Sequence, residues 1–327
     1  MQVTPASEYL TREERSALMK HKDGLAAWEI LQHWAVIIGA FAMVHFFPNV
    51  LTVILALFLI GGKQLACAIL MHDAGHYAVL GNKKWNDVVG QWLGAYPIFN
   101  NMKRYRDYHF QHHKHTGLED DPDLLLTRGY PTSPSSMRRK FFRDLTGQTG
   151  IKALFGLMMM HVGLLEYSLG GKIIKPDPKP SQTQILKNAW TNLKGPLAAN
   201  LVMLALLWAL SSPWLYLLWI GAYLTTFQFS LRVRSIAEHS VLENPTDPYL
   251  NTRTTLANFW ERHLFAPYHV NYHCEHHMLM AVPSYNLPEM HRILMERGFY
   301  ERGVMAQNYW EVIRKAGSES QDRVKPA

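Results

Sequence analysis

Apolar residues gather in two pairs of long runs along the chain. The first pair covers about residues 28–70 and turns at Pro48-Asn49, and the second covers about residues 197–230 and turns at Ser211–Pro213. About 20 mainly apolar residues are needed to cross a bilayer. Each pair therefore predicts a transmembrane helical hairpin, with buried hairpins of a soluble protein as the alternative interpretation.

The segments outside the hairpins are too polar to lie in lipid. Residues 72–196 separate the two hairpins and residues 232–315 follow the second. We expect both segments to fold into one helical cap on the same side of the membrane. The pattern thus predicts an all-α membrane protein with four transmembrane helices in two hairpins, and we interpret residues 1–327 as a single domain.

The basic residues are distributed on one side of this predicted topology. The chain has 33 Lys and Arg against 26 Asp and Glu, and apart from Lys63 all of the basic residues lie in the two termini or in the segment between the hairpins. The positive-inside rule then places the termini and the cap in the cytoplasm. No cluster of basic residues interleaved with aromatic ones indicates a nucleic-acid partner.

The cysteine and histidine contents point to different chemistries. Cys67 and Cys274 are the only cysteines, which excludes a disulfide framework and a tetrathiolate zinc site. The 17 histidines raise the question of metal or proton chemistry.

Three short segments are dense in histidine. The first, at the end of the second apolar run, has a spacing of four residues, and the other two share the pattern His-x-x-His-His; the residues are His72 and His76, then His109, His112 and His113, then His273, His276 and His277. On a helix, residues three and four apart lie on one face, so we expect the rings of each segment to converge on one point. Eight imidazoles exceed what one ion can use, and they suit iron, zinc, copper or nickel. The sequence therefore predicts a site for two metal ions in the cap.

A single pair of histidines on a helix is weak evidence for a ligand, but two copies of His-x-x-His-His in one chain rarely arise by chance. The histidines that stand alone are interpreted instead as polar surface or interfacial residues: His21, His33, His45, His161, His263 and His291.

These motifs resemble the integral-membrane fatty acid desaturases and their relatives among hydroxylases and ketolases. The resemblance covers most of the chain. It extends to the residues after the second segment, His112–Gly117 followed by Asp121-Pro122-Asp123, and to Asn271–His277 with Val282–Pro288 after it. Arg234–His239 is similar to the segment that supplies the family's ninth histidine ligand.

The resemblance implies a di-iron centre that uses O2 as co-substrate. It implies nine histidine ligands, with His239 as the ninth, and a desaturase that introduces a double bond into a fatty-acyl chain taken from the bilayer. Free acid, acyl carrier protein thioester and lipid-bound chain remain open as substrates. A hydroxylase, ketolase or decarboxylating oxidase is the alternative on the same scaffold, and a non-redox metal-binding membrane protein is the alternative of another class.

Two further sets of residues follow from the spacing. His269 lies four residues before His273 and competes with His239 for the ninth position if the helix extends back that far. Carboxylate or amide groups near the histidines are candidates to orient the rings, although each of the acidic ones is as well explained by solvent or by a nearby arginine; these candidates are Asp73, Asp107, Glu238, Asn271 and Glu275.

The chain lacks a haem motif, a flavin fingerprint and a set of iron–sulfur cysteines. An oxidase of this kind then requires an external electron donor such as a ferredoxin. The basic residues of the cap are candidates to receive an acidic carrier, and binding to anionic lipid is the equal alternative; they are Lys103, Arg104, Arg106, Arg138, Arg139 and Lys140.

Overall fold

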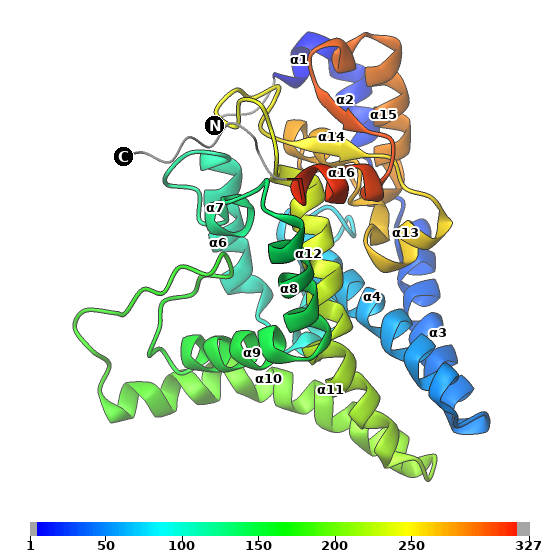
Figure 1. The fold of residues 1–327 in the computed structure, drawn as a ribbon, viewed down its shortest axis with the longest axis vertical. Coiled ribbons are helices and arrows are strands. Elements are labelled where there is room, and N and C mark those ends of the chain that lie inside the picture. Colours follow the sequence, from blue (N-terminus) through cyan, green and yellow to red (C-terminus); the bar gives the residue numbers. More distant parts are fainter. Residues whose placement is uncertain (1–4, 319–327) are drawn as a thin grey trace.

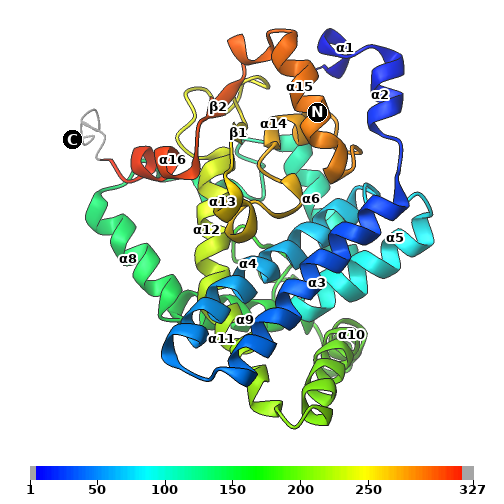
Figure 2. The ribbon, with the colours of Figure 1, turned by 90° about the vertical axis from the view of Figure 1, so that its right-hand side faces the viewer.

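The computed structural model describes residues 5–318, which form helices with one short pair of strands (Figures 1 and 2). The α-helices are α1 (Ala6–Tyr9), α2 (Arg12–Leu18), α3 (Asp23–Phe46), α4 (Val50–Gly75), α5 (Lys83–Val89), α6 (Met102–His115), α7 (Leu124–Thr127), α8 (Pro134–Leu145), α9 (Gln148–His161), α10 (Gln182–Ala209), α11 (Tyr216–Leu224), α12 (Thr226–His239), α13 (Phe259–Leu264), α14 (His273–Met278), α15 (Leu287–Glu296) and α16 (Tyr309–Ala316). The shorter helical turns are η1 (Gly90–Ala95), η2 (Tyr96–Ile98), η3 (Pro213–Leu215), η4 (Pro267–His269), η5 (Ser284–Asn286) and η6 (Phe299–Glu301), and strands β1 (Arg253–Thr255) and β2 (Val304–Ala306) pair in parallel.

The first hairpin consists of α3 and α4, which lie side by side in both views (Figures 1 and 2). The turn is fixed by Asn49, whose side chain accepts a hydrogen bond from the backbone N–H of Thr52, while the Thr52 hydroxyl accepts one from the N–H of Asn49. Such a reciprocal cap satisfies two N–H groups that the helix itself leaves unpaired. Both helices are long and apolar enough to cross a membrane.

The second hairpin differs from the prediction. Within residues 5–318, three helices are long and apolar enough to span a membrane, namely α3, α4 and α10. The fourth expected span is interrupted, because Thr225 leaves the helical region with φ −118° and ψ −88° and separates α11 from α12. The nine residues of α11 are far fewer than the roughly 20 that span a bilayer.

The break coincides with a close helix crossing. A Cβ atom on Gly150 of α9 would lie 2.2 Å from the carbonyl oxygen of Leu224, so α9 lies directly against the end of α11. The Thr225 hydroxyl donates to the carbonyl of Gly221, a local bond of the kind that bends helices.

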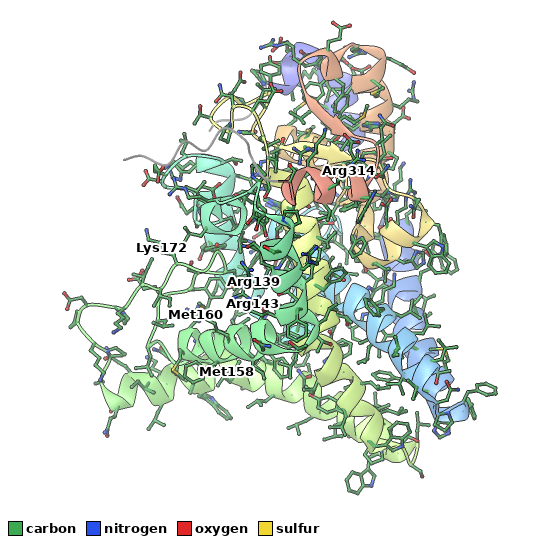
Figure 3. The ribbon with its side chains drawn as sticks, viewed as in Figure 1. Arg139, Arg143, Met158, Met160, Lys172 and Arg314 are labelled. Carbon is green, nitrogen blue, oxygen red and sulfur yellow. The ribbon has the colours of Figure 1, made fainter. Side chains whose placement is uncertain are left out.

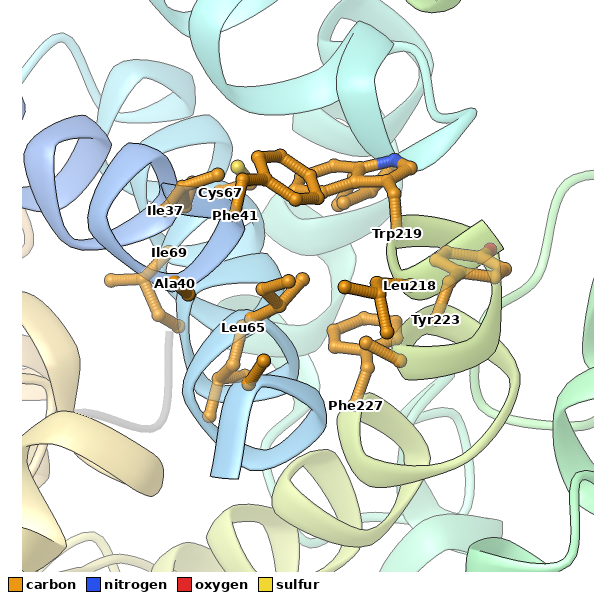
Figure 4. Close-up of a cluster of buried hydrophobic side chains, with 14 of the residues drawn as sticks. Ile37, Ala40, Phe41, Leu65, Cys67, Ile69, Leu218, Trp219, Tyr223 and Phe227 are labelled. Atoms are coloured by element: carbon orange, nitrogen blue, oxygen red, sulfur yellow. The ribbon is translucent and has the colours of Figure 1, made fainter. Parts of the chain in front are cut away.

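The apolar core lies between the two hairpins. Figure 4 shows Phe41 of α3, Leu65 of α4, Trp219 of α11 and Phe227 of α12 meeting there. Trp219 is fully buried, and its indole N–H donates to the carbonyl of Pro97. Packing in this core holds α4 against α3, α11 and α12.

Three other helices meet the C-terminal end of α4. These are α6, α12 and α14, which come from distant parts of the sequence (Figure 2). The short α14 is held by β1, since the Thr254 hydroxyl accepts a hydrogen bond from the backbone N–H of Cys274. The histidine-rich segments lie where these helices meet.

Candidate metal centre

Nine histidines from four helices lie in one region. They come from the C-terminal end of α4, from α6, from the last residue of α12 and from α14: His72, His76, His109, His112, His113, His239, His273, His276 and His277. All of them are buried except His239, which is partly exposed. The nine positions that spacing and resemblance singled out are therefore neighbours in space.

The nine residues separate into two groups. Within each group the ring nitrogens that could serve as ligands all lie within 4.8 Å of one another. The first group contains His72, His76, His109, His113 and His276, and the second contains His112, His239, His273 and His277.

The two His-x-x-His-His segments do not each converge on one point, which corrects the expectation from spacing. On α6, His109 and His113 belong to the first group and His112 to the second, whereas on α14 His273 and His277 belong to the second group and His276 to the first. Adjacent helical residues point about 100° apart. Each helix therefore serves both groups and lies between them.

Several ring nitrogens are spaced as two ligands of one ion would be. Nε2 of His113 lies 3.0 Å from Nε2 of His109 and 3.1 Å from Nε2 of His276, and the Nε2 atoms of His239 and His273 are 2.8 Å apart. Two nitrogens bound at about 2.0–2.1 Å to one ion, at right angles, are about 3.0 Å apart. The residues present thus fit a metal ion in each group.

Four of the rings are anchored through Nδ1. The partners are the Asp73 carboxylate for His72 at 2.7 Å, the Asp121 carboxylate for His112 at 2.8 Å, the Asn251 carbonyl for His239 at 3.1 Å and the Thr116 hydroxyl for His277 at 3.4 Å. Nε2 of His72 and of His277 is buried and has no hydrogen-bond partner within residues 5–318. One ring nitrogen held from outside and the other free is the arrangement of a metal-binding histidine.

The protonation states agree with this geometry. Burial holds the pKa values of His109, His113 and His276 well below the ordinary value, so these rings are neutral, which is the form that binds metals. Burial also lowers the pKa of His112. The hydrogen bond to Asp121 and the charge of Asp123 outweigh this effect, so the pKa of His112 lies above the ordinary value.

Two of the five predicted orienting residues lie beside the rings. Asp73 bonds to His72, as described above. The Glu238 carboxylate lies 3.6 Å from Nδ1 of His273 and accepts a hydrogen bond from Nε of Arg234 at 2.7 Å. Burial raises the pKa of Glu238 to about 7, against the opposing charge of Arg234.

The other three have different surroundings. Asp107 is exposed on α6. Glu275 is buried but bonds to Thr254, His291 and Tyr300 rather than to one of the nine histidines. Asn271 is buried, and neither of its side-chain polar atoms has a partner within residues 5–318.

Asp121 is an orienting residue that the sequence-based reasoning missed. Its Oδ2 atom also accepts a hydrogen bond from the backbone N–H of Gly117. This second bond holds the carboxylate in position beside His112. The available signal was the Asp121-Pro122-Asp123 segment nine residues after His112.

Apart from the candidate ninth ligand, the histidines outside the three motifs differ in burial and lie outside the two groups. His269 belongs to neither group, because η4 ends before α14 begins and α14 starts only at His273. His33 and His161 are buried, with exposed fractions of 4% and 0%, so their assignment to the surface or interface was wrong. His161 bonds to the carbonyl of Phe99.

A cavity of about 310 Å³ adjoins both groups. His109, His112, His239 and His273 form part of its wall. Apolar side chains from α9, α11 and α12 line another part, among them Leu157, Tyr223 and Phe227. The cavity thus connects the histidines with the apolar interior of the helical hairpins.

Comparison with known proteins gives consistent matches. The fatty acid desaturase family matches residues 45–310. Dihydrorhizobitoxine desaturase of Bradyrhizobium elkanii is 30% identical over 262 residues, covering 76% of this chain and 69% of that protein. The mouse fatty acid desaturase 2-like protein FADS2B is 22% identical over 264 residues, covering 74% of this chain and 50% of the relative.

Proposed function

The chain belongs to the fatty acid desaturase family, and from this premise we propose that it is an O2-dependent di-iron membrane oxidoreductase that desaturates a fatty-acyl chain. It is an enzyme of the desaturase type, and its apolar helices agree with a membrane protein. The metal, the substrate and the orientation in the membrane are parts of the proposal.

The observation that carries the proposal is the pair of buried histidine groups. Five histidines in one group and four in the other would each hold one iron ion, and neither group contains a sulfur ligand. Bound iron would supply the activation of dioxygen that removal of two hydrogens from an unactivated carbon chain requires. The protein would hold the ions through neutral imidazoles and keep those rings in place through Asp73 and Asp121.

The cavity beside the histidines supports an apolar substrate. Its wall at Leu157, Tyr223 and Phe227 would bind a hydrocarbon chain, and burial of that chain would exclude water from the reacting carbons. The carbons that lie nearest His109 and His112 would be the ones oxidised, because the fixed wall determines how far the chain enters.

The inner part of the same cavity favours a second candidate substrate class. Arg234 and Glu238 line the cavity beside the histidines, and the only hydrogen bond of the Arg234 guanidinium within residues 5–318 is the one from its Nε to Glu238. An acidic head group on a shorter chain would pair with this guanidinium. One similar enzyme is named for dihydrorhizobitoxine rather than for a fatty acid.

The orientation and the electron source complete the proposal. The distribution of basic residues supports placing both termini and the histidine groups in the cytoplasm. Electrons would come from a separate ferredoxin-type protein.

The test combines metal analysis with product analysis. Protein purified without oxygen is expected to contain close to two iron ions per chain, and to consume O2 only when a substrate, NAD(P)H, a ferredoxin and its reductase are all present. Mass spectrometry then distinguishes desaturation, which removes two hydrogens, from hydroxylation, which adds one oxygen. Full activity with zinc and without iron would overturn the di-iron proposal, and metal binding without O2 consumption would favour a non-redox protein.

A further inference from the structure

A second cavity, of about 330 Å³, lies on the other side of α4. It is lined by α3, α4, α13, η4 and Ala266, and it shares no lining residue with the cavity beside the histidine groups. None of the nine histidines of the two groups lines it. The proposed oxidation chemistry therefore leaves this cavity without a role.

Lys63 is the most unusual residue in its wall. It belongs to α4, a helix that could cross a membrane, and only 8% of it is exposed. Within residues 5–318 its ammonium group has no hydrogen bond and no ion pair. Burying an unpaired charge is costly, and a charged residue within a membrane span usually marks a binding site or pathway. The cavity provides the space for the missing partner.

The surrounding groups define the charge of that partner. Arg262 and three histidines, His33, His263 and His269, line the same cavity. The one acidic residue in the wall is Glu29, and it accepts a hydrogen bond from the Ser284 hydroxyl at 2.7 Å and forms no ion pair with Lys63. Lys63 and Arg262 outnumber the one carboxylate in this wall, so the wall favours an anion over a metal ion.

Three residues of the wall also carry polar atoms that lack partners. The Tyr268 hydroxyl, Nδ1 of His33 and Nδ1 of His269 are buried without a hydrogen bond within residues 5–318. Tyr268 and His269 both have left-handed backbone angles, with φ of 52° and 55°, which is strained for residues with a side chain. Such strain is commonly found at functional sites.

The position of the cavity indicates where the anion comes from. The exposed part of α4 includes Val50 and Leu55, whereas the helix is buried almost continuously from Ile60 onward. Phe259 and Trp260 of α13, which line or flank the cavity, are about two-thirds exposed. Exposed aromatic residues of this kind are typical of the membrane interface. This arrangement favours a lipid head group as the source of the anion.

We propose that this cavity binds the phosphate group of an anionic membrane lipid, with Lys63 and Arg262 as its cationic contacts. The site is independent of the proposed enzymatic activity. Its occupant stabilises the folded protein, because a ligand that binds only the folded state raises its stability with concentration.

The test measures thermal unfolding of the full-length protein in neutral detergent during titration with phosphatidylglycerol. The wild-type midpoint is expected to rise with phosphatidylglycerol. In Lys63→Met the apparent affinity falls about tenfold or more, since a hydrogen bond to a charged group is lost. Without the lipid, this variant unfolds at the same temperature as the wild type or higher, because the unpaired charge is gone. A lysine with a purely structural role would instead lower the midpoint and leave the lipid response unchanged.

Two further variants and two further ligands sharpen the result. Arg262→Gln is expected to weaken the response, whereas Lys187→Gln, which removes an exposed charge on α10, is expected to keep it. An equal response in the wild type and Lys63→Met, or no response in the wild type, overturns the site. A further outcome is that inorganic phosphate or a free fatty acid raises the midpoint while phosphatidylglycerol does not. That result would exclude the phosphate group of a lipid as the occupant.

Discussion

At the scale of single residues, His112 shows how a candidate ligand is held by a group outside the metal centre. For His112, Nδ1 meets the Asp121 carboxylate, and Asp121 is itself held by the N–H of Gly117. The orientation of the ring thus depends on a loop residue that, within residues 5–318, forms no hydrogen bond to another of the nine histidines. Changes at Asp121 therefore test the metal proposal without altering a ligand.

We predict that Asp121→Asn lowers metal affinity about 10–100-fold, the usual effect of losing a group that orients a ligand. The amide carries no charge, and it cannot accept hydrogen bonds at both of its terminal atoms. Metal retained per chain during competition with a chelator measures the effect. Asp107→Asn is the control, because Asp107 is an exposed carboxylate on α6. An equal loss in both variants would contradict the prediction.

A second prediction separates His239 from His269. Removing a ligand opens one coordination position, so His239→Ala is expected to lose iron and to form no product. His269→Ala is expected to keep most of its iron, since His269 lies outside both groups. Iron content and product are compared on folded protein at matched expression. Iron depletion in His269→Ala with wild-type behaviour in His239→Ala would reverse the assignment.

The sequence indicated the histidines but not how they are shared. His109, His112 and His113 lie near one helix face by their spacing. That spacing is the same whether the three rings bind one ion or two. Their division depends on where α14 and α12 lie, which is a tertiary property. The role of Asp121 was hidden for the same reason, because it is set by a loop after the helix and not by helical spacing.

At the scale of elements, α4 is the helix on which the others assemble. Gly61 and Gly62 let two neighbours approach its backbone: a Cβ atom on Gly61 would lie 2.3 Å from the Thr226 hydroxyl oxygen and 2.8 Å from the backbone nitrogen of Phe227, and one on Gly62 would lie 2.5 Å from the carbonyl of His263. The glycine pair therefore permits the contacts of α4 with α12 and α13.

We predict that Gly61→Ala destabilises the protein by about 1–3 kcal/mol, the usual cost of inserting an atom into a packed region. The backbone of α12 would have to move, and His239 at its end would move with it. Gly39→Ala on α3 is the control, because a Cβ atom there meets nothing within 4 Å. Thermal unfolding should show an unchanged or slightly higher midpoint for Gly39→Ala, and a similar fall in both variants would contradict the packing argument.

The sequence predicted the helices α3 and α4 closely because the apolar runs and the Pro48-Asn49 turn act locally. It did not predict the break at Thr225. No proline or glycine marks that position, and the interruption accompanies the crossing of α9 through Gly150, about 75 residues earlier in the chain. An apolar run indicates that a segment is buried or lies in a membrane. It does not indicate whether the segment forms one continuous helix.

At the scale of the whole molecule, the basic residues proposed for donor binding differ in availability. Arg104 donates to the carbonyl of Met160, and Arg106 donates to Asp87 and to the carbonyl of Gly75. Arg138 and Arg139 are exposed on α8, on which Figure 3 labels Arg139. If an acidic carrier binds this chain through the proposed residues, α8 is the better candidate surface.

We predict that Arg138→Glu with Arg139→Glu slows ferredoxin-dependent turnover about tenfold at low salt, because electrostatic steering speeds association by that factor or more. The effect should shrink at high ionic strength, where exposed charges are screened. Lys83→Glu with Lys84→Glu is the matched control, since α5 lies on the opposite side of the molecule from α8 (Figure 2). A loss that is independent of salt, or equal in the control, would argue against steering.

The division of the histidines also determines when the ligands of each group become available during synthesis on the ribosome. Four of the five histidines of the first group lie within the first 113 residues, whereas three of the four in the second lie at or beyond His239. At about 5–20 residues per second, roughly 10–30 s of translation separate His113 from the start of α14. A nascent chain therefore offers a nearly complete first group well before the second exists, and α14 completes both groups in a single late step.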